Sequence, residues 1–531
     1  MRSWNGWGDE AVHYPVPAGG ADFLAQRVGP AHAGPDASLD ACLASVPASP
    51  LAEHPLVSTD ARERLWHARG QSLPDLIAMR SGQIDAFPDG VARPTSEAEV
   101  RALYDHARKI GARLIPWGGG TSVVGHVNPR RQDAPVITVD LGLLDRLVDL
   151  DEQSRLATFE AGVAGPSLEA QLAVKGYTLG HFPQSFEYST LGGWIATRSS
   201  GQQSYHYGRI EDLFAGGRVE TPVGTLDMPN LPATAAGPDL RQLILGSEGR
   251  LGIVTRASVR VRPIAQDESF HGIFFPDWQS GTDAVRTIAQ AGIGVSMLRL
   301  SDPDETETQL ALAGMPRVMP WVNRGLRLVG YGDTRCILML GLTGDAAATA
   351  DARSRAFEIC RKQGGFVSGT LLGKKWEHNR FRAPYLRNTL WQAGYAIDTL
   401  ETAVPWSGVH ATATAVKTAL RTGLQPVGER VHAFAHLSHL YPDGASIYTT
   451  YVFRRGSSAE ETMERWRVLK GAASEAIVAH KGTISHQHGV GADHLPYLEA
   501  EKGVLGMQVL EAARKSLDPD GLLNPGKLLP A

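Results

Sequence analysis

The chain has 531 residues, more than one ordinary hydrophobic core organises, and this length predicts two to four domains. Hydrophobic residues make up 43% and charged residues 20%, as in typical globular proteins, and the formal net charge of −4 argues against a nucleic-acid partner. The three cysteines are far apart and predict neither a disulfide framework nor structural zinc, and no segment has the pattern of a signal peptide or a membrane span. We therefore expect a cytoplasmic globular protein.

The N-terminal region, residues 1–85, is rich in proline, alanine and glycine. This composition predicts an extension of loops and short helices that wraps a larger body. Segments 60–70 and 73–80 are expected to be helical.

From residue 86 onward, helices and strands are predicted to alternate. Ser96 and Glu99 have capping-box spacing before an apolar stripe that stops at Gly111, which predicts a helix. Strands are expected at 112–116, 136–141, 156–161 and 254–261, and a further helix at 167–175. We interpret residues 86–265 as one domain.

The character of the sequence changes after residue 265. Segments 270–275 and 295–300 predict strands, and segment 281–291 predicts a helix. The same mixture continues to about residue 475, so residues 266–475 are predicted to form a separate α+β domain.

Three glycine-rich segments lie beside predicted strands of the first domain. They are Pro116-Trp-Gly-Gly-Gly-Thr-Ser122, Gln184-Ser-Phe-Glu-Tyr-Ser-Thr-Leu-Gly-Gly193 with Thr197-Arg-Ser-Ser-Gly201, and Gly246-Ser-Glu-Gly-Arg-Leu-Gly-Ile-Val254. Glycines let backbone N–H groups approach a phosphate, and hydroxyl side chains add donors. One such loop is often a plain turn, but three in one domain favour a long dinucleotide ligand.

The cofactor contacts expected from these loops are therefore numerous. They are Pro116, Trp117, Gly118, Gly119, Gly120, Thr121 and Ser122 in the first loop; Gln184, Ser185, Phe186, Glu187, Tyr188, Ser189, Thr190, Gly193, Thr197, Arg198, Ser199 and Ser200 in the second; and Glu248, Gly249, Arg250, Leu251, Gly252, Ile253 and Val254 in the third.

The order of these segments resembles the flavin domain shared by vanillyl-alcohol oxidase and p-cresol methylhydroxylase. The tail Leu517-Asp-Pro-Asp-Gly-Leu-Leu-Asn-Pro-Gly-Lys527 resembles the terminal segment of that superfamily and implies that residues 476–531 return to the flavin domain. The implied fold class is α+β, a two-part FAD-binding domain of the p-cresol methylhydroxylase type with an inserted α+β substrate (cap) domain. Thr121 stands where several members carry the histidine that links FAD covalently, so the resemblance implies non-covalent FAD.

Further motifs resemble the alkyldihydroxyacetonephosphate synthase family. They include Trp4-Asn-Gly-Trp-Gly8, Gly180-His181, Tyr207-Gly-x-Ile-Glu-Asp212, Gly237-Pro-Asp239 and Ser485-His-x-His-Gly-Val-Gly491. The resemblance implies ether-lipid synthesis without net redox chemistry: flavin N5 attacks an acyl-dihydroxyacetone phosphate, the fatty acid leaves, and a long-chain alcohol replaces it. We therefore expect a small-molecule or lipid-like substrate, peripheral contact with a membrane, and a homodimer.

Tyr448 and two arginines are candidate active-site residues. Tyr448 matches the tyrosine that the family uses as proton acceptor and donor; a phenol with an ordinary pKa near 10 needs activation, for instance by imidazoles. Arg387 matches the arginine that the family directs at the substrate phosphate, and a guanidinium suits an oxyanion. Arg299 interrupts an apolar strand, where a buried charge needs a ligand or partner. The alternative for Tyr448 is a structural tyrosine of the hydrophobic core. The alternative for Arg387 is an arginine on a helix surface.

Histidines complete the candidate site. His181 matches an active-site histidine of the family, and His486 and His488 flank Gln487, where the family has three consecutive histidines. Gln487 can form hydrogen bonds but cannot titrate. No metal site is expected, because His436 and His439 would point to opposite faces of a strand.

Two other functions stay open from the sequence. One is an FAD-dependent oxidoreductase, an oxidase or dehydrogenase of a hydroxy acid or alcohol, in which the flavin accepts hydride and His488 or Tyr448 takes the hydroxyl proton. The other is a flavin-binding protein without catalysis, which the arginine and histidine candidates disfavour.

Overall fold

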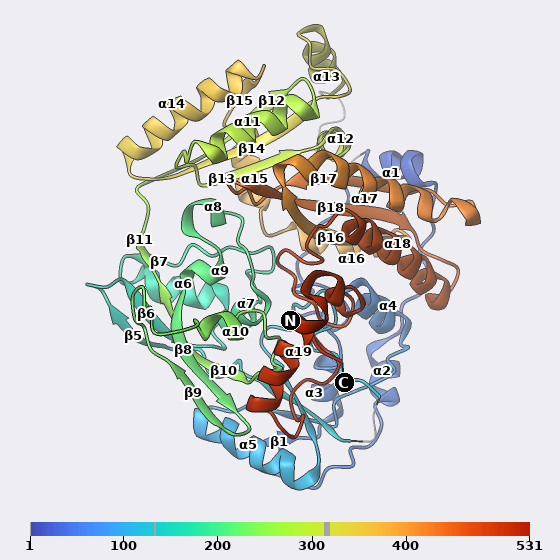
Figure 1. The fold of residues 1–531 in the computed structure, drawn as a ribbon. Coiled ribbons are helices and arrows are strands. Elements are labelled where there is room, and N and C mark those ends of the chain that lie inside the picture. Colours follow the sequence, from blue (N-terminus) through green and yellow to red (C-terminus); the bar gives the residue numbers. More distant parts are fainter. Residues whose placement is uncertain (1, 18, 132–133, 313–318, 531) are drawn as a thin grey trace.

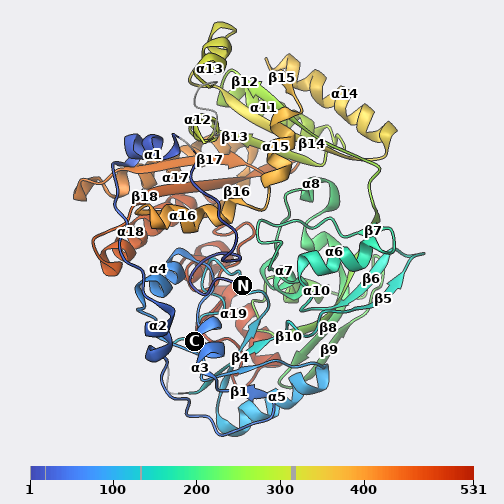
Figure 2. The same ribbon diagram turned by 180° about the vertical axis from the view of Figure 1, so that it is seen from behind.

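The computed structural model describes residues 2–17, 19–131, 134–312 and 319–530, which form a lower and an upper body in the view of Figure 1. Although it comes last in the chain, α19 (Leu495–Leu517) lies within the lower body (Figures 1 and 2). No helix of the described ranges is both long and apolar enough to cross a membrane.

The N-terminal region consists of short elements that contact both bodies. They are α1 (Gly20–Val28), α2 (Leu39–Ser45), β1 (Val57–Ser58), α3 (Ala61–Trp66) and α4 (Leu73–Ser81). The helix expected over 60–70 is shorter, because the backbone leaves the helical conformation at His67. The helix expected over 73–80 is confirmed, and Ser72 and Asp75 form a reciprocal capping box at its start.

A four-stranded sheet forms the bottom of the lower body. Its strands are β2 (Gly90–Ala92), β3 (Arg113–Trp117) and β4 (Val136–Asp140), which are parallel, with β1 antiparallel at the edge, in the order β1-β2-β4-β3. The predicted helix after Ser96 is α5 (Glu97–Ile110), which ends at Gly111 with a φ of 71°. The capping box expected there is incomplete, because the Glu99 carboxylate accepts from Thr95 N at 2.6 Å instead.

A five-stranded antiparallel sheet completes the lower body. Its order is β5 (Leu147–Asp151), β6 (Leu156–Glu160), β10 (Ile253–Arg260), β8 (Phe214–Thr221) and β9 (Gly224–Met228). The helices of this region are α6 (Gly165–Ala173), α7 (Leu191–Thr197), α8 (Ser204–Tyr207), α9 (Ile210–Leu213) and α10 (Arg241–Ile244), and β7 (Tyr177–Thr178) pairs with β11 (Arg262–Pro263). Leu168 and Trp194 from α6 and α7 pack with Phe159 and Phe214 in its core.

The C-terminal segment returns to the lower body, beside the strand that precedes the first glycine-rich loop. Leu523 forms a parallel bridge with Leu114 of β3, and Asn524 N donates to Leu114 O at 2.9 Å. The last residues therefore help to hold the edge of the four-stranded sheet.

The upper body is built on a seven-stranded antiparallel sheet. In sheet order its strands are β15 (Phe366–Gly369), β12 (Asp267–Phe275), β14 (Cys336–Gly344), β13 (Met297–Ser301), β17 (Val431–Leu437), β18 (Gly444–Arg454) and β16 (Tyr395–Pro405). The helices are α11 (Trp278–Gln290), α12 (Pro303–Ala311), α13 (Met319–Leu328), α14 (Ala346–Lys362), α15 (Leu371–Asn379), α16 (Leu386–Gln392), α17 (Val409–Gly423) and α18 (Ala459–Ala479).

One face of this sheet is covered by helices. Leu298, Leu300, Leu338 and Leu340 pack with residues of α11, α14 and α17 in one apolar core. Because successive side chains of a strand point to opposite faces, the residues between these leucines face the other way, toward the glycine-rich loops.

Candidate active site

A cavity of about 690 Å³ lies where the glycine-rich loops meet the inner face of the seven-stranded sheet. The sheet contributes residues two apart on its strands: Met297, Arg299 and Ser301 on β13, Ile397 and Thr399 on β16, Phe434 and His436 on β17, and Tyr448 and Thr450 on β18. The strand period of two therefore brings an arginine, a histidine and a tyrosine to one surface.

Close packing of the first two loops explains their glycines. A Cβ on Gly119 would lie 1.6 Å from the Tyr188 carbonyl oxygen, and a Cβ on Gly118 would lie 2.2 Å from Thr190 Oγ1. No side chain fits at either position, so the two loops form one nearly continuous backbone surface.

A second cavity, of about 670 Å³, shares Trp117, Gly118–Gly120 and Thr190 with the first. Together the two cavities form an elongated site with the triple glycine at its middle. Buried polar atoms on the wall of the first cavity, Trp7 Nε1, Gln202 Oε1 and Asn524 Oδ1, have no hydrogen-bond partner in the described part of the chain. An elongated site with a glycine cradle and unpartnered donors and acceptors fits FAD.

Most residues expected to contact the cofactor line one of the two cavities. They are Pro116, Trp117, Gly118, Gly119, Gly120, Thr121, Ser122, Gln184, Ser185, Ser189, Thr190, Gly193, Thr197, Ser199, Ser200, Glu248, Gly249, Gly252, Ile253 and Val254 in the first cavity, and Tyr188 in the second.

Five of the expected contacts line neither cavity: Phe186, Glu187, Arg198, Arg250 and Leu251. Phe186 stacks on Phe381 with ring centres 5.0 Å apart, and Leu251 is buried in the core of the lower body. Arg198 pairs with Glu211 at 3.1 Å, and Arg250 donates to the carbonyl of Leu523. Glu187 accepts from the Tyr385 hydroxyl at 3.1 Å. These side chains support the loops on the side that faces away from the cavities.

Tyr448 lies on the cavity wall between two imidazoles. Its ring stacks on His436 with centres 4.9 Å apart and meets the edge of His488 at 5.9 Å. Burial, together with the carboxylates of Glu401 and Asp398, raises the pKa of Tyr448 to about 12. The phenol therefore holds its proton at neutral pH and is placed to donate it.

The two candidate arginines line the same cavity from different elements, α16 and β13. Arg387, on α16, donates to the carbonyl of Gln71 at 2.5 Å, which fixes the guanidinium and leaves donors for a ligand. Arg299 pairs with Glu305 at 2.6 Å, and Glu305 also accepts from His436 Nδ1 at 3.1 Å. The partner required by Arg299 is thus a buried glutamate on α12.

The three predicted histidines lie at different places relative to the cavity. His488 lines the cavity, whereas His181 and His486 are not among its lining residues. His181 is fully buried against Trp194 and bonds to Ser199 Oγ at 3.2 Å, and burial lowers its pKa to about 3. His181 therefore supports the second loop as a neutral imidazole.

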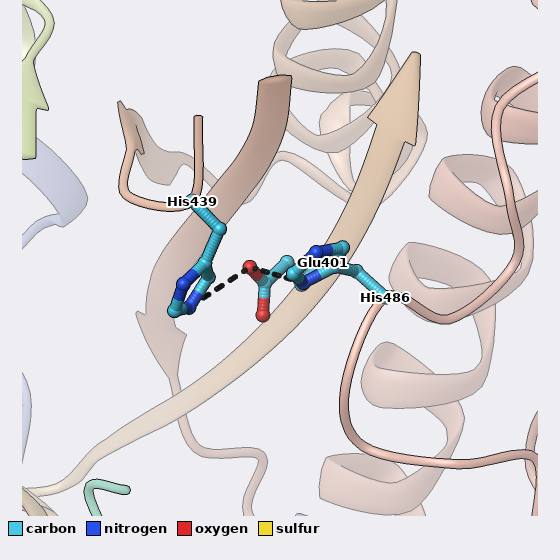
Figure 3. A group of neighbouring side chains, drawn as sticks. All are labelled: Glu401, His439 and His486. Carbon is cyan, nitrogen blue, oxygen red and sulfur yellow. Dashed lines mark ion pairs between the residues drawn. The ribbon is translucent and has the colours of Figure 1, made fainter. Parts of the chain in front are cut away.

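Glu401 of β16 lies between His439 and the catalytic candidate His486 (Figure 3). Its carboxylate faces His486 Nδ1 at 3.1 Å and His439 Nε2 at 4.0 Å, and accepts from Gln487 Nε2 at 2.5 Å. Burial alone would raise the pKa of Glu401, but the neighbouring imidazoles outweigh burial and lower it. His486 Nε2 forms a hydrogen bond with the Tyr441 hydroxyl at 2.7 Å, whereas Nδ1 faces Glu401 without a hydrogen bond among the described residues.

Strand alternation does not separate the histidines in the way expected from the sequence. His439 lies beyond the end of β17 at Leu437, so strand alternation does not apply to it. Ligand atoms of Glu401, His439 and His486 lie within 4.8 Å of one another, close enough to hold a metal ion or to share a proton. His436 belongs to the separate group with Arg299 and Glu305.

Several functional residues have no local signal in the sequence. Glu401 lies opposite Tyr448 in the β16–β18 pairing, a contact between distant segments. Trp7, His126 and Asn524 also line the cavity, and they come from opposite ends of the chain and the loop after Ser122. Of these, Trp7 and Asn524 belong to segments recognised from the sequence, Trp4-Asn-Gly-Trp-Gly8 and the tail Leu517–Lys527, but neither residue was singled out there.

Comparisons with known proteins agree with this geometry. The family described as "FAD binding domain" matches residues 88–227, and the family described as "FAD linked oxidases, C-terminal domain" matches residues 264–528. The chain therefore binds FAD as its cofactor. A solved p-cresol methylhydroxylase aligns with a TM-score of 0.66 at 14% identity, over 89% of this chain and 93% of that one, which confirms the expected fold class.

Two comparisons extend over most of the chain at higher identity. The alkyldihydroxyacetonephosphate synthase of Dictyostelium discoideum is 32% identical over 480 residues, which cover 89% of this chain and 78% of that protein. A solved alkyldihydroxyacetonephosphate synthase aligns with a TM-score of 0.84 at 28% identity, over 99% of both chains. The chain belongs to the alkyldihydroxyacetonephosphate synthase family of FAD-dependent enzymes.

Proposed function

We propose that this enzyme exchanges the acyl group of an acyl-dihydroxyacetone phosphate for a long-chain alcohol. The observation that carries the proposal is one cavity that unites the triple-glycine loop, Tyr448 and Arg387 with a long apolar wall. Met297, Leu310, Leu312, Met339, Leu372 and Phe434 belong to this wall. A small hydroxy acid would leave such a surface unused, whereas two fatty chains would bury it.

The exchange is balanced without an electron acceptor. The bond between C1 and the acyl oxygen breaks, the fatty acid leaves, and the alcohol supplies the ether oxygen and one proton. FAD supplies the nucleophilic N5 atom when it is bound. Arg387 holds the substrate phosphate, and Tyr448 moves the C1 proton while His436 and His488 contact its ring.

The experiment is a direct assay of the purified protein with an acyl-dihydroxyacetone phosphate and hexadecanol. The proposal predicts release of fatty acid and formation of an equal amount of ether product. Reduction of a dye by an unphosphorylated hydroxy acid, with no fatty acid released, would instead establish the oxidoreductase alternative.

The FAD of this enzyme is proposed to be non-covalent, since Thr121 occupies the loop position of the linking histidine. Acid precipitation should then leave the flavin in the supernatant. Flavin fluorescence that remains with the polypeptide on a denaturing gel would show a covalent bond, for which His126 on the cavity wall would be the first residue to examine.

Peripheral contact with a lipid surface is proposed through α13 and the start of α15. Trp321, Leu328 and Leu371 are 73%, 80% and 77% exposed, and Arg324 and Arg327 lie exposed on the same helix as Trp321. Leu372, next to Leu371, lines the cavity. These exposed apolar and basic side chains lie beside the apolar wall of the cavity, an arrangement that suits entry of lipid substrates from an anionic bilayer. Trp321→Ala with Leu328→Ala should reduce sedimentation with anionic vesicles.

A homodimer is proposed from the exposed apolar residues of α19. Val504, Leu505 and Val509 are 61%, 72% and 57% exposed, which is costly unless a partner covers them. Light scattering should give twice the mass of the chain, and Leu505→Glu should lower that mass; a monomeric wild type would contradict the proposal.

A further inference from the structure

The first residues of the chain lie between the lower and upper bodies, where the N-terminus is marked in Figures 1 and 2. Arg2 forms an antiparallel bridge with Asp9, and Ser3 N donates to Gly8 O at 2.8 Å. Residues 2–9 therefore fold into a tight turn of chain, which we call the N-terminal hairpin.

Specific contacts hold the N-terminal hairpin in place. Asn388 of α16 accepts from Trp7 N at 3.0 Å and donates to Trp7 O at 2.8 Å, and Arg80 of α4 donates to Asn5 O at 2.7 Å. Gly8 has a φ of 81° and lies so close to Tyr385 that a Cβ would be 2.2 Å from its ring. The hairpin is thus packed against the helix that also carries Arg387.

Arg2 lies at the triple-glycine loop. Its guanidinium donates to the carbonyl of Gly119 and lies over the Tyr188 ring, 5.1 Å from the centre. Arg2 lines the second cavity and makes no ion pair within the described residues. Burial lowers the pKa of Arg2 and outweighs the nearby Asp140, which forms no ion pair with it, so a further anion beside the guanidinium would offset the cost of burial.

Two other arginines that line this cavity form ion pairs, unlike Arg2. Arg69 pairs with Asp85, and Arg93 pairs with Glu63 at 2.6 Å and with Asp140 at 3.1 Å. Their charges are already balanced within the protein. The charge of Arg2 is therefore available to a phosphate at the glycine loop, where guanidinium and backbone N–H groups both favour an anion.

Trp7 closes the first cavity from the same hairpin. It is 4% exposed, meets the edge of Tyr188 with ring centres 5.7 Å apart, and lines the cavity beside Gly118–Gly120. Its indole Nε1 is buried and has no hydrogen-bond partner among the described residues. A buried indole N–H normally has a partner, so a bound ligand is expected to supply one.

We propose that the N-terminal hairpin is a third part of the FAD site, in which Arg2 binds the diphosphate and Trp7 closes the flavin cavity. The glycine-rich loops shape the cradle, and the hairpin supplies the balancing positive charge. This role concerns cofactor binding and does not depend on which reaction the enzyme catalyses.

The test is FAD titration of the deflavinated protein, followed by flavin fluorescence. Arg2→Ala removes one charged hydrogen bond and should raise the Kd for FAD roughly 10- to 100-fold. Arg2→Lys keeps the charge but loses the planar fork and should recover part of the affinity. Arg27→Ala is the matched control, since Arg27 pairs with the exposed Glu307 on the surface and should leave the Kd unchanged.

A second variant, Trp7→Ala, tests whether Trp7 shields the flavin from solvent. The bound flavin of this variant should be quenched more strongly by iodide than that of the wild type, because the wall over the cavity is lost. Circular dichroism and the melting temperature of the flavin-free variants show whether they fold. Folded Arg2→Ala and Trp7→Ala variants with wild-type Kd and wild-type quenching would overturn the inference and leave FAD binding by the loops intact.

Discussion

Tyr448 is the residue whose chemistry depends most on its surroundings. Its pKa is raised to about 12, so it acts from the protonated state unless a bound substrate or cofactor stabilises the phenolate. Tyr448→Phe removes one oxygen from an otherwise intact site. We expect normal flavin content and a roughly hundredfold or larger fall in turnover, the scale of a lost general acid–base. Turnover near the wild-type rate would remove Tyr448 from the mechanism.

Arg387 is the residue that we expect to bind the substrate phosphate. Arg387→Lys retains a positive charge but loses the guanidinium fork that Gln71 O holds in place. The expected result is a raised KM for the phosphorylated substrate with a smaller change in kcat, measured in steady-state assays. A kcat that collapses at unchanged KM would place Arg387 in the chemical step instead.

Glu401 is expected to act as a positioning residue through His486 and Gln487. Glu401→Gln keeps the shape but replaces a carboxylate that accepts from Gln487 and faces His486 Nδ1. Loss of a charged hydrogen bond corresponds to roughly a tenfold to hundredfold loss of activity. The pH profile of kcat should also shift, because the charge balance of the imidazoles changes. The control is Glu499→Gln on the exposed side of α19; an unchanged rate and pH profile in Glu401→Gln would show a merely structural role.

At the scale of elements, the glycine-rich loops owe their function to packing between separate segments. Gly119→Ala places a Cβ 1.6 Å from the Tyr188 carbonyl oxygen, so the two loops must separate and the cradle widens. We expect the variant to purify with little flavin, read from the ratio of flavin to protein absorbance. Gly294→Ala is the matched control, because a Cβ there meets no atom within 4 Å. Full flavin content in Gly119→Ala would show that the loop assignment is wrong.

Local pattern was enough to predict the glycine-rich loops and to single out Arg299, because each carries a signal in a few consecutive residues. The strand containing Arg299 was expected from its apolar residues and is β13 in the structure. Tyr448 and Arg387, by contrast, were expected only from the resemblance to the family. Within the loops, however, sequence alone does not tell which side chains face the cavities, and Phe186 and Leu251 line neither cavity.

The site residues that the sequence could not predict are brought into place by contacts between segments far apart in the chain. Glu401 reaches the site because β16 pairs with β18, and its own segment carries no motif. His439 was placed on a strand by alternation, but the strand ends at Leu437, so its partners are set by tertiary packing instead. Such contacts depend on strand order, which a single sequence does not fix.

At the scale of the whole molecule, buried histidines make stability depend on pH. Burial lowers the pKa of His181 and His439 to about 3 and that of His432 to about 4, whereas an unfolded histidine titrates near 6.5. Their stabilisation is complete above about pH 6.5 and is lost as the pH falls, because the unfolded chain takes up the protons first. Asp302 and Asp493, whose pKa burial raises to about 6 and about 7, act in the opposite direction.

The histidines outnumber these aspartates, because burial also lowers the pKa of His106, His206, His271, His436, His488 and His494. The free energy of unfolding should therefore fall between pH 6 and pH 5, as measured by urea unfolding at fixed FAD concentration. Stability that is constant or higher at pH 5 would contradict the assignment of neutral, buried imidazoles.

The molecule as a whole is expected to use FAD for an exchange without net oxidation. The most direct measurement is anaerobic incubation of the holoenzyme with an acyl-dihydroxyacetone phosphate and hexadecanol, with fatty acid and ether product quantified together. An exchange without net oxidation predicts equal amounts of both products over many turnovers with no electron acceptor present. Absence of both products, together with lasting reduction of the flavin by an unphosphorylated hydroxy acid, would contradict it.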